Sequence, residues 1–189
     1  MSRPVDSAMR FKHLPNQLSL FRMGVIPLIL LLYPLGFKSL QLFSALLFAL
    51  AAISDWLDGY IARKYYAESK LGAILDPIAD KMLTGTALIL LANSQAVWAW
   101  MAGFLLAREL GMSGLRLVAQ QQGIVIQVST LGKVKTLLLD LALVCLLVNY
   151  PLWGLPFREI GMISIWLALG VSLYSAWQYI REFMGQARF

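Results

Sequence analysis

Long apolar segments separated by short polar turns run along almost the whole chain. Six of them are long enough to cross a membrane as helices, because a spanning helix needs about 20 apolar residues. Their approximate boundaries are residues 19–36, 40–64, 70–93, 96–120, 131–150 and 158–182. Spanning segments must satisfy their own backbone hydrogen bonds, and no strand-like alternation is visible, so helices are expected. The pattern predicts an all-α integral membrane protein with six transmembrane helices.

The segment before the first span is polar and lacks the pattern of a cleavable signal sequence. It places Phe11, Leu14 and Leu18 among basic residues. Such a segment either lies along the membrane interface as a short helix, attracted by anionic lipid, or forms a solvated basic tail. We expect residues 1–189 to form one membrane domain, with residues 1–18 as an N-terminal juxtamembrane segment.

The composition agrees with a membrane protein and limits the chemistry. The chain is 59% hydrophobic and 14% charged, whereas soluble domains carry about 25% charged residues. The single cysteine, Cys145, excludes an intrachain disulfide and a cysteine-based metal site. Because Cys145 lies in an apolar segment, we expect a buried free thiol.

The positive charges collect on one predicted side of the membrane. The chain holds 16 Lys and Arg against 10 Asp and Glu, and only Lys38 and Arg158 fall on the poorer side. The richer side holds Arg3, Arg10, Lys12, Arg22, Arg63, Lys64, Lys70, Arg116, Lys133, Lys135, Arg181 and Arg188. Cytoplasmic loops are enriched in Lys and Arg. Both termini are therefore expected in the cytoplasm, and the protein in a bacterial inner membrane.

Four aspartates interrupt the second and third predicted spans, where an unpaired carboxylate is costly. They form the pairs Asp55 and Asp58, and Asp76 and Asp80. Each pair shares one helix face, because the spacings are i, i+3 and i, i+4. In an antiparallel hairpin that turns near Ala67, Asp55 lies level with Asp80, and Asp58 with Asp76. If the two faces meet, four carboxylates converge on one pocket that opens to the cytoplasm.

Four carboxylates in one pocket repel one another, so they either share protons or bind divalent cations. Oxygen-only ligands favour Mg²⁺ or Mn²⁺ over Zn²⁺, and two such ions would suit phosphoryl transfer. Gly59, Ala62 and Gly72 leave room for a ligand beside the carboxylates, although small residues also permit close helix packing. Arg63 either contacts a phosphate or anchors its helix at the interface.

The spacing of these residues resembles the signature of the CDP-alcohol phosphotransferase family. The matching positions are Asp58, Gly59, Ala62, Arg63, Gly72, Asp76 and Asp80, and Asp55 matches the extended form of the signature. Eight fixed positions at fixed spacing make a specific motif. The predicted six spans also resemble the transmembrane core of that family, so the resemblance covers nearly the whole chain.

The resemblance implies a role for each matching residue. Asp55, Asp58, Asp76 and Asp80 would bind metal, with Asp80 as general base. Gly59, Ala62, Arg63 and Gly72 would line the CDP pocket. An alcohol hydroxyl would attack the phosphate that carries the lipid, and CMP would leave.

Basic residues outside the signature bear on the acceptor alcohol. Arg108 and Arg116 lie in the fourth predicted span, and Lys133 and Lys135 open the fifth. Together they could surround the phosphate of an acceptor such as glycerol 3-phosphate, which an uncharged alcohol would not require. As alternatives, Arg108 forms a structural pair with Glu109 or another carboxylate, and the lysines are ordinary cytoplasmic anchors.

Three segments resemble the phosphatidylglycerophosphate synthase branch of the family. They are Leu14-Pro-Asn16 with Arg22, Ala107-Arg-Glu109, and Gly132-Lys-Val-Lys-Thr136. This branch implies transfer of a phosphatidyl group from CDP-diacylglycerol to glycerol 3-phosphate. Asn16 either contacts the nucleotide or caps the first helix.

Other functions remain open at this point. A different branch of the family would make phosphatidylserine, phosphatidylinositol phosphate or cardiolipin. In another class, a cation or proton transporter would use the aspartates as a relay. An apolar helix face could form a homodimer, although contact with lipid leaves the same pattern. No nucleic-acid partner is expected.

Overall fold

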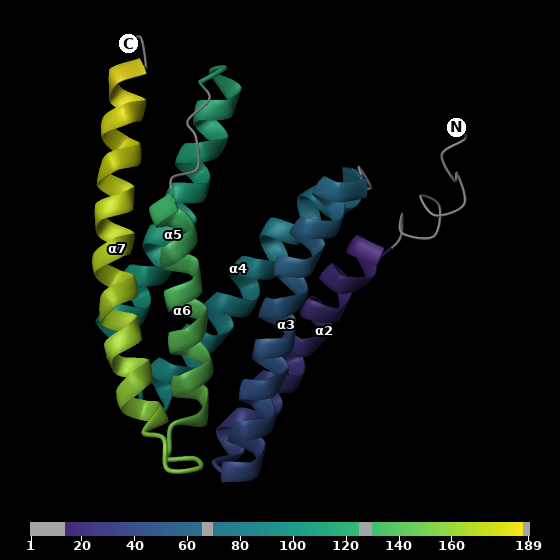
Figure 1. Ribbon diagram of the computed structural model, residues 1–189, viewed down its shortest axis with the longest axis vertical. Coiled ribbons are helices and arrows are strands. Elements are labelled where there is room, and N and C mark those ends of the chain that lie inside the picture. The colour runs from purple at the N-terminus through teal and green to yellow at the C-terminus, as the bar shows by residue number, and fades with distance from the viewer. Residues whose placement is uncertain (1–13, 66–69, 125–129, 187–189) are drawn as a thin grey trace. The chain divides into compact units, whose positions relative to one another are not determined.

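The computed structural model describes residues 14–65, 70–124 and 130–186, with side chains at residues 19–54, 76–124 and 131–186. In these ranges the chain forms six α-helices and one short 3₁₀ helix, and no strand (Figure 1). They are α2 (Leu14–Leu32), η1 (Tyr33–Leu35), α3 (Lys38–Tyr65), α4 (Lys70–Asn93), α5 (Ala99–Gln121), α6 (Thr130–Val148) and α7 (Phe157–Gln186). The prediction of an all-α chain with six helices in this order is confirmed for the described residues.

The first helix is longer than the apolar pattern predicts. α2 begins at Leu14 rather than at residue 19. Pro15 stands at the start of this helix, where the missing N–H costs nothing because the first turn has no intrahelical acceptor. Asn16 consequently lies within the first turn of α2 rather than at its boundary. The predicted interfacial segment before Leu14 lies outside the described residues and stays a prediction.

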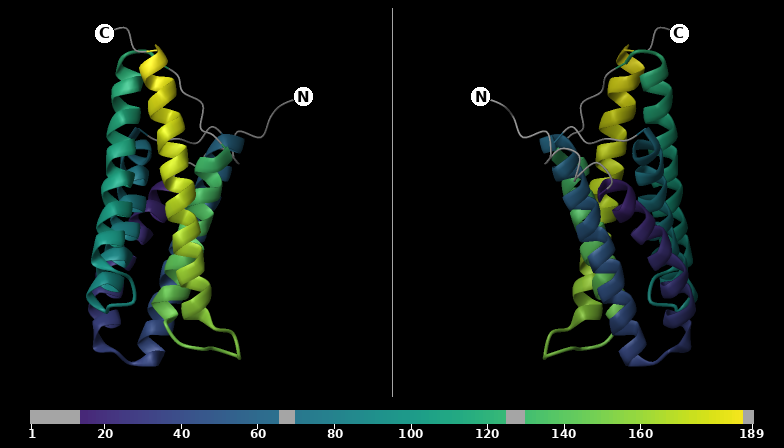
Figure 2. Two further views of the ribbon diagram at one scale, coloured as in Figure 1. Left: turned by 90° about the vertical axis from the view of Figure 1, so that its left-hand side faces the viewer. Right: turned by 90° about the vertical axis from the view of Figure 1, so that its right-hand side faces the viewer.

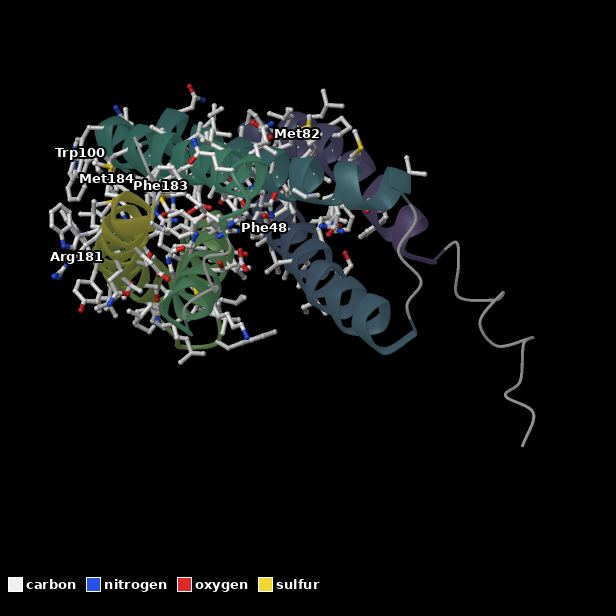
Figure 3. The ribbon with its side chains drawn as sticks, turned by 90° about the horizontal axis from the view of Figure 1, so that it is seen from above. Phe48, Met82, Trp100, Arg181, Phe183 and Met184 are labelled. Atoms are coloured by element: carbon white, nitrogen blue, oxygen red, sulfur yellow. The ribbon has the colours of Figure 1, made fainter. Side chains whose placement is uncertain are left out.

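The chain divides into two compact units, Met1–Ala87 and Leu88–Phe189. In the first unit, η1 joins α2 and α3 into an antiparallel pair (Figure 1). Gly36 ends η1 with a φ of 75°, a left-handed conformation that costs glycine little. Ile29 on α2 and Phe48 on α3 (Figure 3) are fully buried in this pair.

In the second unit, α6 and α7 pack along their lengths and are joined by residues 149–156 (Figure 2). They approach each other closely at Gly161, where an added Cβ would lie 2.6 Å from Cγ of Leu146 and 3.1 Å from Cβ of Cys145. Cys145 is a buried free thiol, as predicted. A glycine here lets the two helices approach more closely than any larger residue would allow.

α7 buries one face and exposes the other. Near its end, Phe183 is buried, whereas the adjacent Met184 is exposed (Figure 3). α5 also packs against α7. Trp98 at the N-cap of α5 and Trp100 in its first turn have ring centroids 6.1 and 6.0 Å from that of Trp166 on α7. In the second unit, α5 and α6 thus both pack against α7.

Among the described residues, α7 is the helix that is long and apolar enough, by length and composition, to cross a membrane. Two shorter apolar helical stretches are Ser19–Leu35 and Lys38–Ser54. The other helices contain the charged residues that suggest a functional site, and each charge lowers the local hydropathy. The charged residues within α4, α5 and α6 include Asp76, Asp80, Lys81, Arg108, Glu109, Lys133, Lys135 and Asp140. Membrane crossing by all six helices stays a prediction.

Candidate functional site

One predicted metal ligand, Asp76, forms an ion pair with Arg22. The Arg22 guanidinium on α2 donates through Nη2 to Oδ1 of Asp76 on α4. Ser19, one turn earlier on the same face of α2, donates its hydroxyl to the same oxygen over 3.3 Å. The Arg22 side chain is 0% exposed and that of Asp76 is 39% exposed. A buried cation therefore neutralises a carboxylate that remains open to a ligand.

Burial corrects the role that the charge pattern gives to Arg22. The charge pattern places Arg22 among the cations of the predicted cytoplasmic surface. A fully buried side chain in an ion pair does not contribute to a surface charge, so this prediction is wrong for Arg22. The correction has a clear physical reason. An arginine inside a predicted span must find an anion, because an isolated charge in an apolar surrounding is costly.

The remaining predicted metal ligands lie on the expected helices. Asp80 is one turn beyond Asp76 on α4 and is half-buried. Asp55 and Asp58 lie on α3 with helical i, i+3 spacing, but their side chains lie outside the described residues. Among the residues with described side chains, no three His, Cys, Asp or Glu form a metal-binding group. The convergence of the four carboxylates stays a prediction.

The predicted nucleotide-contacting residues fall where side chains are not described. They are Asn16, Gly59, Ala62, Arg63 and Gly72. Asn16 lies in the first turn of α2, Gly59, Ala62 and Arg63 in the last part of α3, and Gly72 in the first turn of α4. Their roles in binding CDP stay predictions.

A second polar cluster surrounds Arg108 in the unit that contains α5, α6 and α7. The guanidinium donates from Nε and Nη2 to the carbonyl oxygen of Ser172, over 3.2 and 2.9 Å, and from Nη2 to Oγ of Ser175 over 2.6 Å. Both serines belong to α7. On its other edge, Nη1 donates to Oε1 of Glu109 over 3.0 Å. Arg108 thus connects α5 to α7 and also pairs with a carboxylate.

Glu109 also binds a predicted acceptor residue from a third helix. Lys135 on α6 donates from Nζ to the same Oε1 that accepts from Arg108. The side chains of Arg108, Glu109 and Lys135 are 12, 20 and 9% exposed. We name these three residues the Glu109 cluster. A desolvated group of two cations and one carboxylate interacts more strongly than the same group would in water.

The structure separates the four predicted acceptor-binding residues into two groups. Arg108 and Lys135 meet at Glu109, whereas Arg116 and Lys133 are exposed. The alternative of a structural pair between Arg108 and Glu109 is observed. The alternative of a solvated anchor is wrong for Lys135, which is buried. For Lys133, exposure agrees with either role.

The sequence reasoning did not assign functions to Ser19, Arg22 and Glu109. A signal for the first two existed: Arg22 follows Ser19 by three residues inside a predicted span, so both share a face that must meet an anion. For Glu109, the sequence predicts only a structural pair with Arg108, as the alternative to acceptor binding by Arg108. Its second contact, with Lys135, comes from a residue 26 positions away and has no local signature.

The carboxylate of Asp76 is of the kind that suits a hard divalent cation. Carboxylate oxygens are the ligands that Mg²⁺ and Mn²⁺ prefer, and Asp76 is exposed enough for a ligand to reach it. The contacts from Ser19 and Arg22 both go to Oδ1. These two contacts hold the carboxylate by Oδ1, and neither of them uses its second oxygen, Oδ2.

Comparison with known proteins adds independent information. A family model described as CDP-alcohol phosphatidyltransferase matches residues 12–174, which include the Arg22–Asp76 pair and the Glu109 cluster. A Bacillus subtilis protein is 35% identical over 185 residues, covering 90% of this chain and 94% of the relative. A Rickettsia typhi protein is 38% identical over 171 residues, and a Sodalis glossinidius protein is 38% identical over 175 residues. These alignments cover 90 and 89% of this chain. All three relatives are named CDP-diacylglycerol–glycerol-3-phosphate 3-phosphatidyltransferase.

Proposed function

Because the chain belongs to the CDP-alcohol phosphatidyltransferase family, we propose that it transfers the phosphatidyl group of CDP-diacylglycerol to glycerol 3-phosphate and releases CMP. The relatives whose names state this reaction align with about nine-tenths of the chain. The same alignment covers most of each relative, so the resemblance is not limited to one motif.

The Glu109 cluster is the observation that favours an anionic acceptor. Its two cations, Arg108 and Lys135, are both largely buried. Two largely buried cations that lie together attract a further anion more strongly than they would in water. The phosphate of glycerol 3-phosphate is such an anion, because charge-assisted hydrogen bonds from Arg and Lys to phosphate are strong. Exposed Arg116 and Lys133 would attract it from the solvent.

The reaction forms one bond to phosphorus and breaks another. A hydroxyl oxygen of glycerol 3-phosphate attacks the phosphorus that carries diacylglycerol, and the bridging oxygen leaves with CMP. Asp80 accepts the hydroxyl proton, which requires an ionised carboxylate within hydrogen-bonding distance of the attacking oxygen. Its neighbour Asp76 is held by Ser19 and Arg22, so the face of α4 that carries both is fixed.

Dependence on a divalent metal is general in this family, and for this chain we favour two Mg²⁺ or Mn²⁺ ions. Asp55, Asp58, Asp76 and Asp80 would hold them, and their chemistry would be to offset the charge on the phosphates. Arg22 and Ser19 contribute by holding Oδ1 of Asp76. Asn16, Gly59, Ala62, Arg63 and Gly72 would contact the CDP group of the donor.

A lipid environment suits the surface of both units. Large apolar side chains point outward along the helices, with Leu31 70%, Leu137 66% and Ile163 63% exposed. In water such a surface would aggregate, whereas in a bilayer it contacts acyl chains. We therefore propose six membrane-spanning helices in a bacterial inner membrane, with both termini in the cytoplasm. The match over residues 12–174 supports one domain; a homodimer stays a proposal.

A panel of acceptors tests the function directly. The purified protein is incubated with CDP-diacylglycerol and one acceptor at a time, and CMP release is measured. Glycerol 3-phosphate should support turnover, whereas serine, inositol phosphate and phosphatidylglycerol should not. EDTA should abolish turnover, and Mg²⁺ or Mn²⁺ should restore it. Turnover with another acceptor alone would move the chain to a different branch, and ion flux in proteoliposomes without CMP release would favour a transporter.

A further inference from the structure

We propose that Glu109 is the internal counter-ion of the acceptor site, and that the acceptor phosphate displaces its carboxylate from Arg108 and Lys135. The inference rests on the proposed function, because it assumes an acceptor that carries a phosphate. It adds a specificity-determining role for a residue that touches both cations through one oxygen, Oε1.

The geometry of Arg108 shows which edge would receive the phosphate. Nε and Nη2 are held by the Ser172 carbonyl and the Ser175 hydroxyl on α7, so this edge stays in place when Glu109 leaves. The Nη1 edge contacts Glu109 alone among the described side chains. A planar guanidinium fixed along one edge presents the other edge at a defined position. The departing carboxylate therefore uncovers a preoriented donor.

Charge balance favours displacement over simple addition. Arg108 and Lys135 carry two positive charges, and both pair with the single charge of Glu109. A phosphate monoester carries about 1.5 to 2 negative charges near neutral pH. It matches the two cations closely once Glu109 withdraws, whereas a carboxylate that remained would repel it at short range. Glu109 is the most exposed member of the cluster, at 20%, so its flexible side chain has solvent to move into.

Displacement would make the site selective for charged acceptors. An uncharged alcohol cannot neutralise Arg108 and Lys135 in place of the carboxylate. Glu109 therefore stays bound to them and blocks the site for the alcohol. An anion that can neutralise both cations replaces Glu109 at little net cost. The Glu109 carboxylate competes with every ligand for this site, but a phosphate can displace it and a neutral alcohol cannot. The site therefore binds a phosphate in preference to a neutral alcohol.

The test measures binding without turnover. Isothermal titration calorimetry on the detergent-solubilised protein, without donor lipid, compares inorganic phosphate and glycerol 3-phosphate as ligands. Glu109→Gln keeps the shape of the side chain and removes the competing charge, so both ligands should bind about tenfold more tightly, or about 1.4 kcal/mol. Glu159→Gln, at an exposed glutamate in the first turn of α7, makes the same change in net charge and should leave affinity unchanged.

Two further variants locate the effect. Adding Lys135→Met to Glu109→Gln should remove the gain in affinity, because the gain depends on a released lysine. Glu109→Asp keeps the charge but shortens the arm, so it should give a smaller gain and also serves if the glutamine variant fails to fold. Equal or weaker phosphate binding by folded Glu109→Gln or Glu109→Asp would overturn the inference, and would identify Glu109 as a residue that only positions the cations.

Failure of the inference differs from failure of the proposed function. If the wild type uses glycerol 3-phosphate but Glu109→Gln gains no affinity, only the displacement is wrong. If the wild type neither binds nor uses glycerol 3-phosphate and instead turns over an uncharged alcohol, both are wrong.

Discussion

Arg22 on α2 and Asp76 on α4, 54 positions apart in the chain, form an ion pair whose cation is fully buried and whose carboxylate is partly exposed. The asymmetry is informative. A buried arginine cannot move away from its site without exposing a cavity or an unpaired charge, whereas the exposed side of Asp76 can accept a ligand. The pair thus holds one of the four signature carboxylates in a fixed orientation before any metal binds.

Removing the cation should destabilise the metal-free protein. Arg22→Gln leaves Asp76 without its charged partner; breaking a buried pair costs about 3–5 kcal/mol, and the exposure of Asp76 reduces this to about 2. The melting temperature in EDTA should fall, and added Mg²⁺ should restore more stability to the variant than to the wild type. Ser19→Ala, which removes the 3.3 Å hydrogen bond that Ser19 donates to the same oxygen, should cost only about 0.5–1 kcal/mol. Equal melting of Arg22→Gln and wild type in EDTA would show that the pair contributes no stability.

Asp80→Asn should separate catalysis from folding. The amide has nearly the same size as the carboxyl group but cannot accept the hydroxyl proton, so turnover should fall by about 10²–10⁴-fold. The melting temperature should change little, because Asp80 is only half-buried. CMP release at saturating glycerol 3-phosphate measures the effect, with Glu159→Gln as a control that keeps normal turnover. Near-normal CMP release by Asp80→Asn would remove Asp80 from the list of essential residues.

The helices could be predicted from the sequence because each long apolar segment has only one way to satisfy its backbone in lipid. The partners between helices could not. The spacing of Ser19 and Arg22 indicates that they share a helix face, but nothing in the spacing identifies Asp76 as the residue that this face contacts. Glu109 is a sharper case. Adjacent helical residues do not face each other, yet the length of the Arg108 side chain lets it reach Glu109, and the contact with Lys135 depends on how α5 and α6 pack.

The start of α2 and the contact between Gly161 and α6 also could not be predicted from the sequence. The apolar pattern does not include Leu14, because Pro15, Asn16 and Gln17 interrupt it. Gly161 gives no sign in the sequence that it differs from Gly170 nine residues later on α7. Only the structure shows that the first contacts α6, while the second has no atom within 4 Å of an added Cβ.

This difference between glycines supplies a matched pair of substitutions. Gly161→Ala places a Cβ 2.6 Å from Cγ of Leu146, so α6 and α7 must separate or repack, at a cost of about 1–3 kcal/mol. Gly170→Ala is exposed and unobstructed, so it should be neutral or stabilise the helix by up to about 1 kcal/mol. Thermal unfolding of both variants in the same detergent measures the difference. Equal stability would mean that α6 and α7 are free to separate at Gly161 without cost.

Arg108 should contribute to stability through α7 as well as to acceptor binding. Arg108→Lys keeps the charge and a contact with Glu109 but loses the fork that binds the Ser172 carbonyl and Ser175 hydroxyl, so α5 and α7 lose their polar connection. The expected loss of stability is about 1–3 kcal/mol, since a charged donor is withdrawn from buried acceptors. Measuring it without substrate separates it from any effect on the acceptor.

Ser175→Ala is the matched test of that connection. It removes one of the three contacts between the Arg108 guanidinium and α7, the 2.6 Å bond to Ser175 Oγ, and should cost about 1 kcal/mol. In the Arg108→Lys background the same serine substitution should cost less, because its partner is already absent. A double-mutant cycle of melting free energies gives the coupling. Full additivity of the two substitutions would show that Arg108 and Ser175 act independently, and that α7 is held by apolar packing alone.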